Sequence, residues 1–171
     1  MSCDQMANVI SAFGREIGVA LQVDPTGYCC LSAKNNLEIH LKFNPYFDGV
    51  IFYSEIGEVP EMAKKNVFLF FNHENASLEG SGFTFSYSQD SGQIGVACLL
   101  PSRFIELEHF KTLFEHFVNE VEAWSEKMLQ FTRGEMPEHS GSSGSTEKSA
   151  EVSAEAPAPA GGIDPSFFMR V

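Results

Sequence analysis

One run of apolar residues near the C-terminal end constrains the fold more than any other feature of this sequence. Between residues 107 and 131, apolar side chains recur at steps of three and four without a break, at Leu107, Phe110, Phe114, Phe117, Val121, Trp124, Met128 and Phe131. This spacing predicts a long helix with one continuous apolar face. The opposite side is acidic, which is typical of a solvated face. Such a helix requires a second layer of structure to cover its apolar side.

The segments upstream of this helix supply that layer as predicted strands. Residues Leu37–Phe43 alternate between apolar and polar side chains, which is the pattern of a half-buried strand. A hairpin is predicted from the alternation in residues 83–87 and 94–100, with a turn at Gln89–Gly92 between them. Three more segments are expected to be extended, namely Val19–Val23, Tyr28–Ala33 and Gly49–Ile56.

Two shorter helices complete the predicted elements. The first has apolar residues at helical spacing, and it is weakened and then ended by Gly14 and Gly18. The second begins at Val59-Pro60-Glu61 and runs to about Asn75. It contains five consecutive apolar residues, Val67–Phe71, which point all round a helix and therefore need cover on more than one side. That cover is another helix or a second copy of the chain, and a strand interpretation of this block also remains open.

Together these elements predict an α+β domain in residues 1–133, in the order α-β-β-β-α-β-β-α. Its expected core is a twisted antiparallel sheet of about five strands with three helices. Residues 134–162 are rich in Ser, Gly, Ala, Pro and Glu, so a disordered linker is predicted there. Residues 163–171 are apolar again and include Phe167 and Phe168, which form either a short C-terminal docking motif or a passive end.

Composition restricts the classes of partner. The 171 residues include 11 basic and 23 acidic side chains, and the net charge is −12. Such a surface repels phosphate backbones and anionic lipids, so neither nucleic acid nor membrane insertion is expected. It attracts a basic or amphipathic polypeptide, although plain solubility explains the charge equally well. No signal peptide and no apolar run of about 20 residues is present, and the four cysteines lack CxxC spacing, which indicates a cytoplasmic, reducing location.

The sequence contains no recognisable residue pattern of catalysis. The five histidines are far apart in sequence, and no carboxylate or cysteine joins them at the short spacing that metal sites favour. The glycine pair Gly80 and Gly82 precedes a strand, whereas a phosphate-binding loop precedes a helix. The sequence therefore predicts no catalytic residues, no metal site and no cofactor, and the chain is not expected to be an enzyme.

Several short features appear together with this pattern of elements. An Ile56–Pro60 turn enters a helix that ends in Phe70–Asn75, a Gly-rich link follows at Glu79–Gly82, a hairpin ends in Leu99-Leu100-Pro101, and the last helix has a late Trp124. Over residues 3–131 the chain resembles the class I chaperones of type III secretion, the Tir-chaperone-like family. The second helix is richer in Phe than in that family, and the tail beyond Gly134 is longer.

The resemblance implies a bacterial cytoplasmic homodimer that binds the N-terminal region of one or more secreted effectors. The client would stay extended and secretion-competent, and the secretion ATPase would release it. The residues expected to bind the client are Val9, Phe13, Ile17, Leu31, Phe43, Tyr46 and Phe52. The residues expected at the dimer interface are Val67, Phe68 and Phe71, although burial within the monomer remains an alternative for both sets. A non-catalytic carrier of a small apolar ligand, or a general protein–protein adaptor, is the alternative function.

Overall fold

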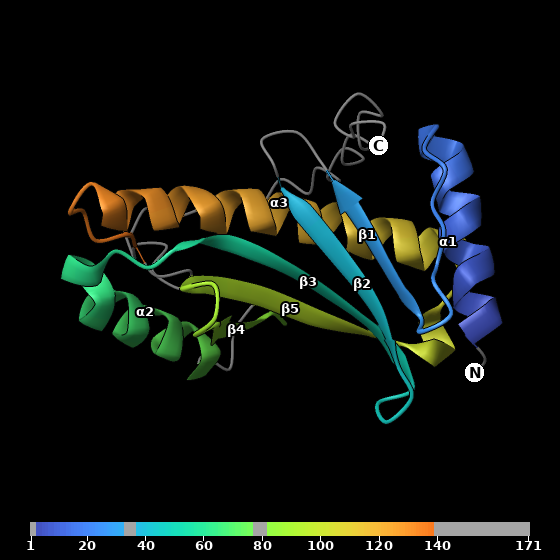
Figure 1. The fold of residues 1–171 in the computed structure, drawn as a ribbon, viewed down its shortest axis with the longest axis horizontal. Helices are drawn as coiled ribbons and strands as arrows, with labels where there is room; N and C mark the ends of the chain where they lie inside the picture. Colours follow the sequence, from blue (N-terminus) through green and yellow to red (C-terminus); the bar gives the residue numbers. More distant parts are fainter. Residues whose placement is uncertain (1–2, 33–36, 77–81, 139–171) are drawn as a thin grey trace, which may run out of the picture.

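The computed structural model describes residues 3–32, 37–76 and 82–138 of the chain (Figure 1). Its elements follow the order α1 (Cys3–Ile17), β1 (Tyr28–Ser32), β2 (Glu38–Asn44), β3 (Gly49–Glu58), the 3-10 turn η2 (Glu61–Ala63), α2 (Lys64–Ala76), β4 (Thr84–Tyr87), β5 (Gln93–Pro101), the 3-10 turn η3 (Ser102–Phe104) and α3 (Leu107–Thr132). This confirms the predicted order of helices and strands. The segment Val19–Val23 is the exception, because it forms no strand and returns from α1 toward β1 as irregular chain.

The five strands form one antiparallel sheet in the order β1-β2-β3-β5-β4. Both edges of the sheet are therefore short strands, β1 and β4. Along β3, alternate side chains from Val50 to Ile56 are buried and the residues between them are not. This is the period-two pattern of a sheet with one covered face. The register between β3 and β5 shifts at Glu55–Gly57, and this irregularity lies near the end of β3.

Helix α3 crosses one face of the sheet and is the main helix of the core (Figure 1). Its apolar face meets two groups of aromatic rings. In one group, Phe52 of β3 lies 5.4 Å from Phe110 and 5.7 Å from Phe117, measured between ring centroids. In the other, Trp124 lies 4.6 Å from Phe85 of β4. The Trp124 indole N–H is satisfied within the same helix, because it donates to Glu120 Oε2 at 2.8 Å.

Helix α1 packs against the N-terminal half of α3. The Phe13 ring lies 5.3 Å from Phe110 and 4.8 Å from Phe114, so the two helices share one aromatic contact region. Lys111 of α3 also pairs with Glu16 of α1 at 2.8 Å. These contacts confirm the amphipathic first helix and fix its position against α3.

The block Val67–Phe71 is helical, so the strand interpretation of it is wrong. Its side chains point to two sides of the helix. Val67, Phe70 and Phe71 face the core and are buried, whereas Phe68 and Leu69 face outward and are exposed. The inward side packs on α3 and β4, where Phe70 lies 5.4 Å from Phe131. One chain therefore covers only part of α2.

The described part of the chain ends shortly after α3. Residues 135–138 continue as irregular chain. Most of the predicted linker and the predicted C-terminal motif with Phe167 and Phe168 lie outside the described residues. Among the described residues, no helix is both long and apolar enough to span a membrane.

Candidate polypeptide-binding surfaces

One edge of the sheet is closed by a side chain. Asn75 of α2 lies beside the edge strand β4, and its Nδ2 donates to the Phe85 carbonyl at 2.9 Å. The Phe85 N–H in turn donates to Asn75 Oδ1 at 2.8 Å. The amide thus takes both outward hydrogen bonds of Phe85, as a neighbouring strand would. Edge strands are commonly protected in such ways, and β4 is protected at this residue.

The opposite edge, β1, is closed only at its first residue. Asp24 pairs with Tyr28, since the Asp24 N–H donates to the Tyr28 carbonyl at 2.8 Å and the Tyr28 N–H donates to Asp24 Oδ1 at 3.0 Å. In an antiparallel pair, the outward-pointing residues alternate. Cys30 and Ser32 are therefore the next residues of β1 to direct their backbone groups away from β2. No described residue takes these backbone hydrogen bonds, so within the described part of the chain the β1 edge is open at Cys30 and Ser32.

Three residues predicted to bind a client lie in the core instead. Phe13, Leu31 and Phe52 are buried, because each occupies the inward side of its helix or strand. Their ring and side-chain neighbours are core residues of the same chain, as for Phe13 against Phe114. A client therefore cannot contact them without opening the core, and the structure corrects this part of the predicted surface.

The other four predicted residues do reach the surface. Val9, Ile17 and Phe43 are half-buried and pack against the edge of the core. Tyr46 is 95% exposed in the turn between β2 and β3. That turn is built by Asn44, whose Oδ1 accepts the N–H groups of Tyr46 and Phe47. Whether these residues bind a client stays a prediction.

The outward side of α2 forms a second apolar surface. Val67 and Phe71, predicted at the dimer interface, are buried within the chain against α3 and β4, so burial within the monomer is the correct alternative for both. Phe68 is 37% exposed and Leu69 is 59% exposed. The Phe68 ring packs edge-on against Tyr87 of β4, with ring centroids 4.9 Å apart. We define the α2 outer face by Phe68, Leu69 and Tyr87.

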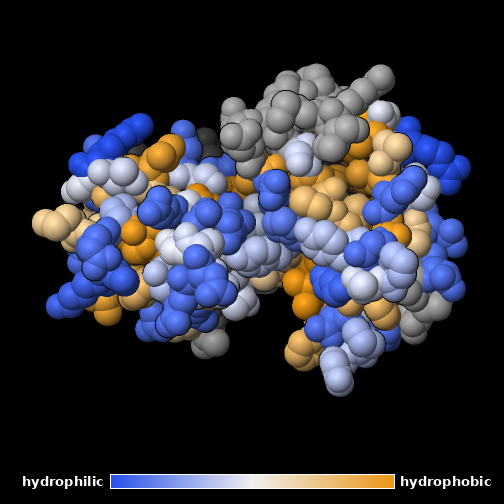
Figure 2. Space-filling model, viewed as in Figure 1, coloured by the Kyte–Doolittle hydropathy of each residue, from blue (hydrophilic) through white to orange (hydrophobic). Residues whose placement is uncertain are grey.

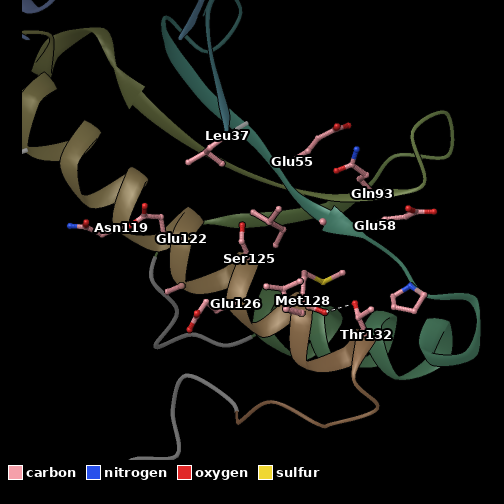
Figure 3. A pocket seen from close by; sticks show the side chains of 15 residues that line it. Leu37, Glu55, Glu58, Gln93, Asn119, Glu122, Ser125, Glu126, Met128 and Thr132 are labelled. Carbon is pink, nitrogen blue, oxygen red and sulfur yellow. Dashed lines mark hydrogen bonds between the residues drawn. The ribbon is translucent and has the colours of Figure 1, made fainter. Parts of the chain in front are cut away.

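A groove of about 1140 Å³ lies between the end of β3 and the C-terminal half of α3 (Figure 3). Gly57 allows the two elements to approach, because a Cβ there would lie 3.1 Å from Met128 Cβ and its φ is +152°. Its lining combines apolar residues, including Leu37, Ile56 and Met128, with four glutamates, Glu55, Glu58, Glu122 and Glu126. We call it the acidic groove.

Several exposed apolar residues were not predicted from the sequence. They are Phe47 in the β2–β3 turn, Leu69 on α2, Leu99 on β5 and Phe104 in η3. Adjacent apolar residues such as Phe68-Leu69 on one helix do signal exposure, because a helix cannot bury all of its sides on one sheet. In the view of Figure 2, hydrophobic residues reach the surface at separated places and not as one continuous patch.

The buried thiols of Cys29 and Cys98 are expected to be unreactive near neutral pH. Burial raises the pKa of Cys29 to about 11 and the pKa of Cys98 to about 12. Both thiols are therefore protonated near neutral pH and pack as small apolar groups.

This combination of fold and surfaces agrees with one protein family. The profile described as the Tir chaperone protein (CesT) family matches residues 8–125 of the chain. The chain belongs to the Tir chaperone protein (CesT) family. The matched region of this Tir chaperone family member begins within α1 and ends within α3, so it includes the whole sheet.

Solved structures share the fold of this Tir chaperone family member at low sequence identity. The ExsC–ExsE complex contains a chain that matches with a TM-score of 0.63 and 14% identity, covering 74% of this chain and 95% of that one. A chain from the HopA1–SchA chaperone–effector complex matches with a TM-score of 0.59 and 12% identity, covering 74% and 98%. The Yersinia pestis type III secretion chaperone SycH, solved with a fragment of YscM2, contributes a match with a TM-score of 0.55 and 11% identity, covering 69% and 98%. No curated protein matches the sequence significantly.

Proposed function

We propose that this chain is a cytoplasmic type III secretion chaperone that binds the N-terminal region of one or more effector proteins. The bound segment is extended and remains competent for secretion. Membership of the Tir chaperone family supports the class of function. The observation that carries the binding mode is the difference between the two sheet edges. Asn75 closes β4, whereas no described residue pairs with the outward backbone groups of β1 at Cys30 and Ser32.

An open edge strand binds an extended polypeptide through main-chain hydrogen bonds, which do not depend on the client's sequence. Alternate side chains of the bound client can then contact apolar side chains of the chaperone. The apolar side chains proposed to receive them are the half-buried Val9, Ile17 and Phe43 of α1 and β2. The net charge of −12 favours clients with basic or amphipathic N-terminal regions.

The active form is proposed to be a homodimer that pairs through the α2 outer face. Phe68 and Leu69 supply exposed apolar area on a helix that one chain covers on one side only. The chain binds and presents its client without catalysing a reaction, and release is left to the secretion ATPase as a further partner.

The alternative function, a carrier of a small apolar ligand, would need an apolar cavity. The acidic groove has apolar lining residues, but four glutamates also line it (Figure 3). Carboxylates in the lining disfavour an apolar ligand and favour a basic segment of polypeptide. The groove therefore supports the chaperone over the carrier.

A pull-down from the native host, followed by mass spectrometry, tests the proposal. The full chain and a chain lacking residues 163–171 serve as baits. The captured protein is then expressed as an N-terminal fragment, and its affinity is measured for Ser32→Pro and Ser32→Ala variants of the chaperone. Proline at Ser32 removes an outward N–H without breaking a hydrogen bond to β2. Alanine keeps that N–H and is the matched control.

We expect Ser32→Pro to weaken the fragment's binding at least 10-fold and Ser32→Ala to leave it within 2-fold, as about 1.4 kcal/mol corresponds to a factor of 10. Circular dichroism should show that both variants are folded. Equal binding by the two variants would contradict the β1 edge as the binding site. Capture of a small molecule in place of a polypeptide would favour the carrier.

A further inference from the structure

Three metal-binding side chains meet on the face of the sheet that the helices leave uncovered. Cys30 on β1 lies directly opposite His40 on β2, and Glu38 lies two residues before His40, so all three point to the same face. Their candidate ligand atoms all lie within 4.8 Å of one another. The alternation from Tyr28 makes Cys30 and His40 a pair without mutual backbone hydrogen bonds, and side chains of such pairs approach most closely.

A neighbouring side chain orients the imidazole of His40. The Tyr28 hydroxyl and His40 Nδ1 are hydrogen-bonded at 2.7 Å, and the two rings are stacked with centroids 6.0 Å apart. His40 Nε2 lies 3.9 Å from Glu38 Oε2 on the other side of the ring. When Nδ1–H donates to the Tyr28 oxygen, Nε2 has a free lone pair directed toward Glu38. Metal-binding histidines are commonly fixed by such a hydrogen bond from the second ring nitrogen.

We propose that Cys30, Glu38 and His40 bind a divalent transition-metal ion, with zinc the best match. A thiolate, an imidazole and a carboxylate are the three side-chain ligands that zinc uses, and three protein ligands leave a fourth position for water. Bonds of about 2.0–2.3 Å to one ion place tetrahedral ligand atoms roughly 3.3–3.8 Å apart. Movement of the exposed Cys30 and Glu38 side chains by about 1 Å reaches this spacing from the structure. On binding, the Cys30 thiol releases its proton to solvent and the sulfur bonds the metal as thiolate.

The set is distinct from the other histidine–carboxylate pairs among the described residues. His116 lies 3.6 Å from Glu120 and His109 lies 3.9 Å from Glu106, both within α3 or at its start. Neither pair has a cysteine or a second carboxylate close enough to complete a set of three among the described residues. These pairs therefore provide matched controls that have two ligands and lack the thiolate.

The proposed metal joins the edge strand to the rest of the sheet. A bond from Cys30 to the two β2 ligands would hold β1 in register, and binding to the folded state alone raises stability. The proposal does not depend on the chaperone function, because it rests only on side chains of the uncovered sheet face.

Cobalt(II) and zinc titrations of the reduced full chain test the site. Cobalt bound to a thiolate gives a near-ultraviolet sulfur-to-metal charge-transfer band, so the band reports Cys30 directly. We expect one cobalt ion per chain, displacement by zinc and an increased melting temperature with zinc. Cys30→Ser should remove the band and weaken zinc binding at least 10-fold. Cys3→Ser and His116→Asn should retain both band and affinity.

Tyr28→Phe provides a second variant that keeps every proposed ligand. Loss of a partner that orients a metal ligand typically costs 10–100-fold in affinity, so at least 10-fold weaker zinc binding with the band retained is expected. Circular dichroism of the metal-free variants checks that they fold. A band that survives Cys30→Ser, or His116→Asn that weakens zinc as much as Cys30→Ser does, would overturn the site. So would the absence of any charge-transfer band in the unmodified chain.

Discussion

The backbone N–H of Val19 donates to the carbonyl of Gly14 at 2.8 Å, so the chain leaving α1 turns back directly against the helix. A Cβ added to Gly14 would lie only 2.6 Å from the Val19 carbonyl oxygen and 3.0 Å from Leu21 Cγ. Gly14 therefore provides room for the return of the chain, in addition to weakening the helix as its sequence position predicts.

Gly14→Ala should destabilise the domain even though alanine favours helices. Overpacking typically costs 1–3 kcal/mol, against a gain of about 1 kcal/mol in helix propensity. We expect a net loss of up to about 2 kcal/mol in the free energy of unfolding, measured by urea denaturation. Asn8→Ala, at an exposed position of the same helix, is the control and should be neutral or slightly stabilising. A more stable Gly14→Ala variant would show that the return of the chain is not tight.

Asn75→Ala removes the two hydrogen bonds that close β4. A buried or partly buried group left without its partner costs about 1–3 kcal/mol, and we expect a loss in that range in urea denaturation. Asn72→Ala, at an exposed position one turn earlier on α2, should change stability by less than about 0.5 kcal/mol. Equal effects of the two substitutions would mean that the amide of Asn75 contributes nothing specific to the edge.

Introducing negative charge on the α2 outer face tests whether this face forms the proposed dimer interface. Phe68→Glu combined with Leu69→Glu should convert the proposed dimer to a monomer, because two carboxylates would be brought into an apolar interface in each chain. Light scattering after size exclusion should give twice the 18.9 kDa of one chain for the unmodified protein and that mass for the variant. Leu99→Glu, an exposed apolar position on the uncovered sheet face, should leave the dimer intact. A monomeric unmodified chain would contradict the proposed interface.

Cysteine modification should follow burial. With Cys3 replaced by serine, iodoacetamide near neutral pH is expected to modify the exposed Cys30 and to leave Cys29 and Cys98 unreacted in the native protein. Burial raises the pKa of Cys29 to about 11 and the pKa of Cys98 to about 12, and it also restricts access to both sulfurs. Peptide mass spectrometry reads the result, and denaturant should expose all three. Fast native modification of Cys98 would show that the core opens readily.

Asp24 should give the domain a pH-dependent contribution to stability. The Tyr28 N–H and the Thr26 hydroxyl hydrogen-bond its carboxylate, and they hold the Asp24 pKa below its usual 3.8. A lowered carboxyl pKa stabilises the fold above pH 3.8, and this stabilisation is lost as pH falls through the lower folded-state value. Asp24→Asn should therefore melt at a lower temperature near neutral pH, and the difference should shrink below pH 3.8. Asp90→Asn in the β4–β5 turn is the control. A constant difference down to strongly acidic pH would contradict the ionic contribution.

The order of the elements could be predicted because each has its own local pattern. The spacing from Leu107 to Phe131 specified α3, and alternation specified β2 and the hairpin. Val19–Val23 was harder, since apolar residues there cover the core between α1 and β1 without pairing as a strand. Apolar periodicity shows that a segment meets the core, but it does not show whether the backbone joins a sheet.

The surface was predicted less well than the fold. Periodicity places Phe13 and Phe52 on apolar faces, and it cannot show that α3 covers those faces completely. Ten of the sixteen Phe residues are buried within one chain, so the aromatic content alone does not require a partner. The Cys30–Glu38–His40 set was missed for a related reason, because its members come from two strands and meet only through their register.

Limited proteolysis of the chaperone with its captured effector tests the central claim most directly. We expect a client segment of roughly 50–100 residues from the N-terminal region to survive digestion only in the complex, since an extended chain is cleaved when free. The Ser32→Pro variant should lose this protection while Ser32→Ala retains it. Protection confined to a folded C-terminal domain of the client, or digestion that is the same with and without the chaperone, would contradict binding of an extended N-terminal segment.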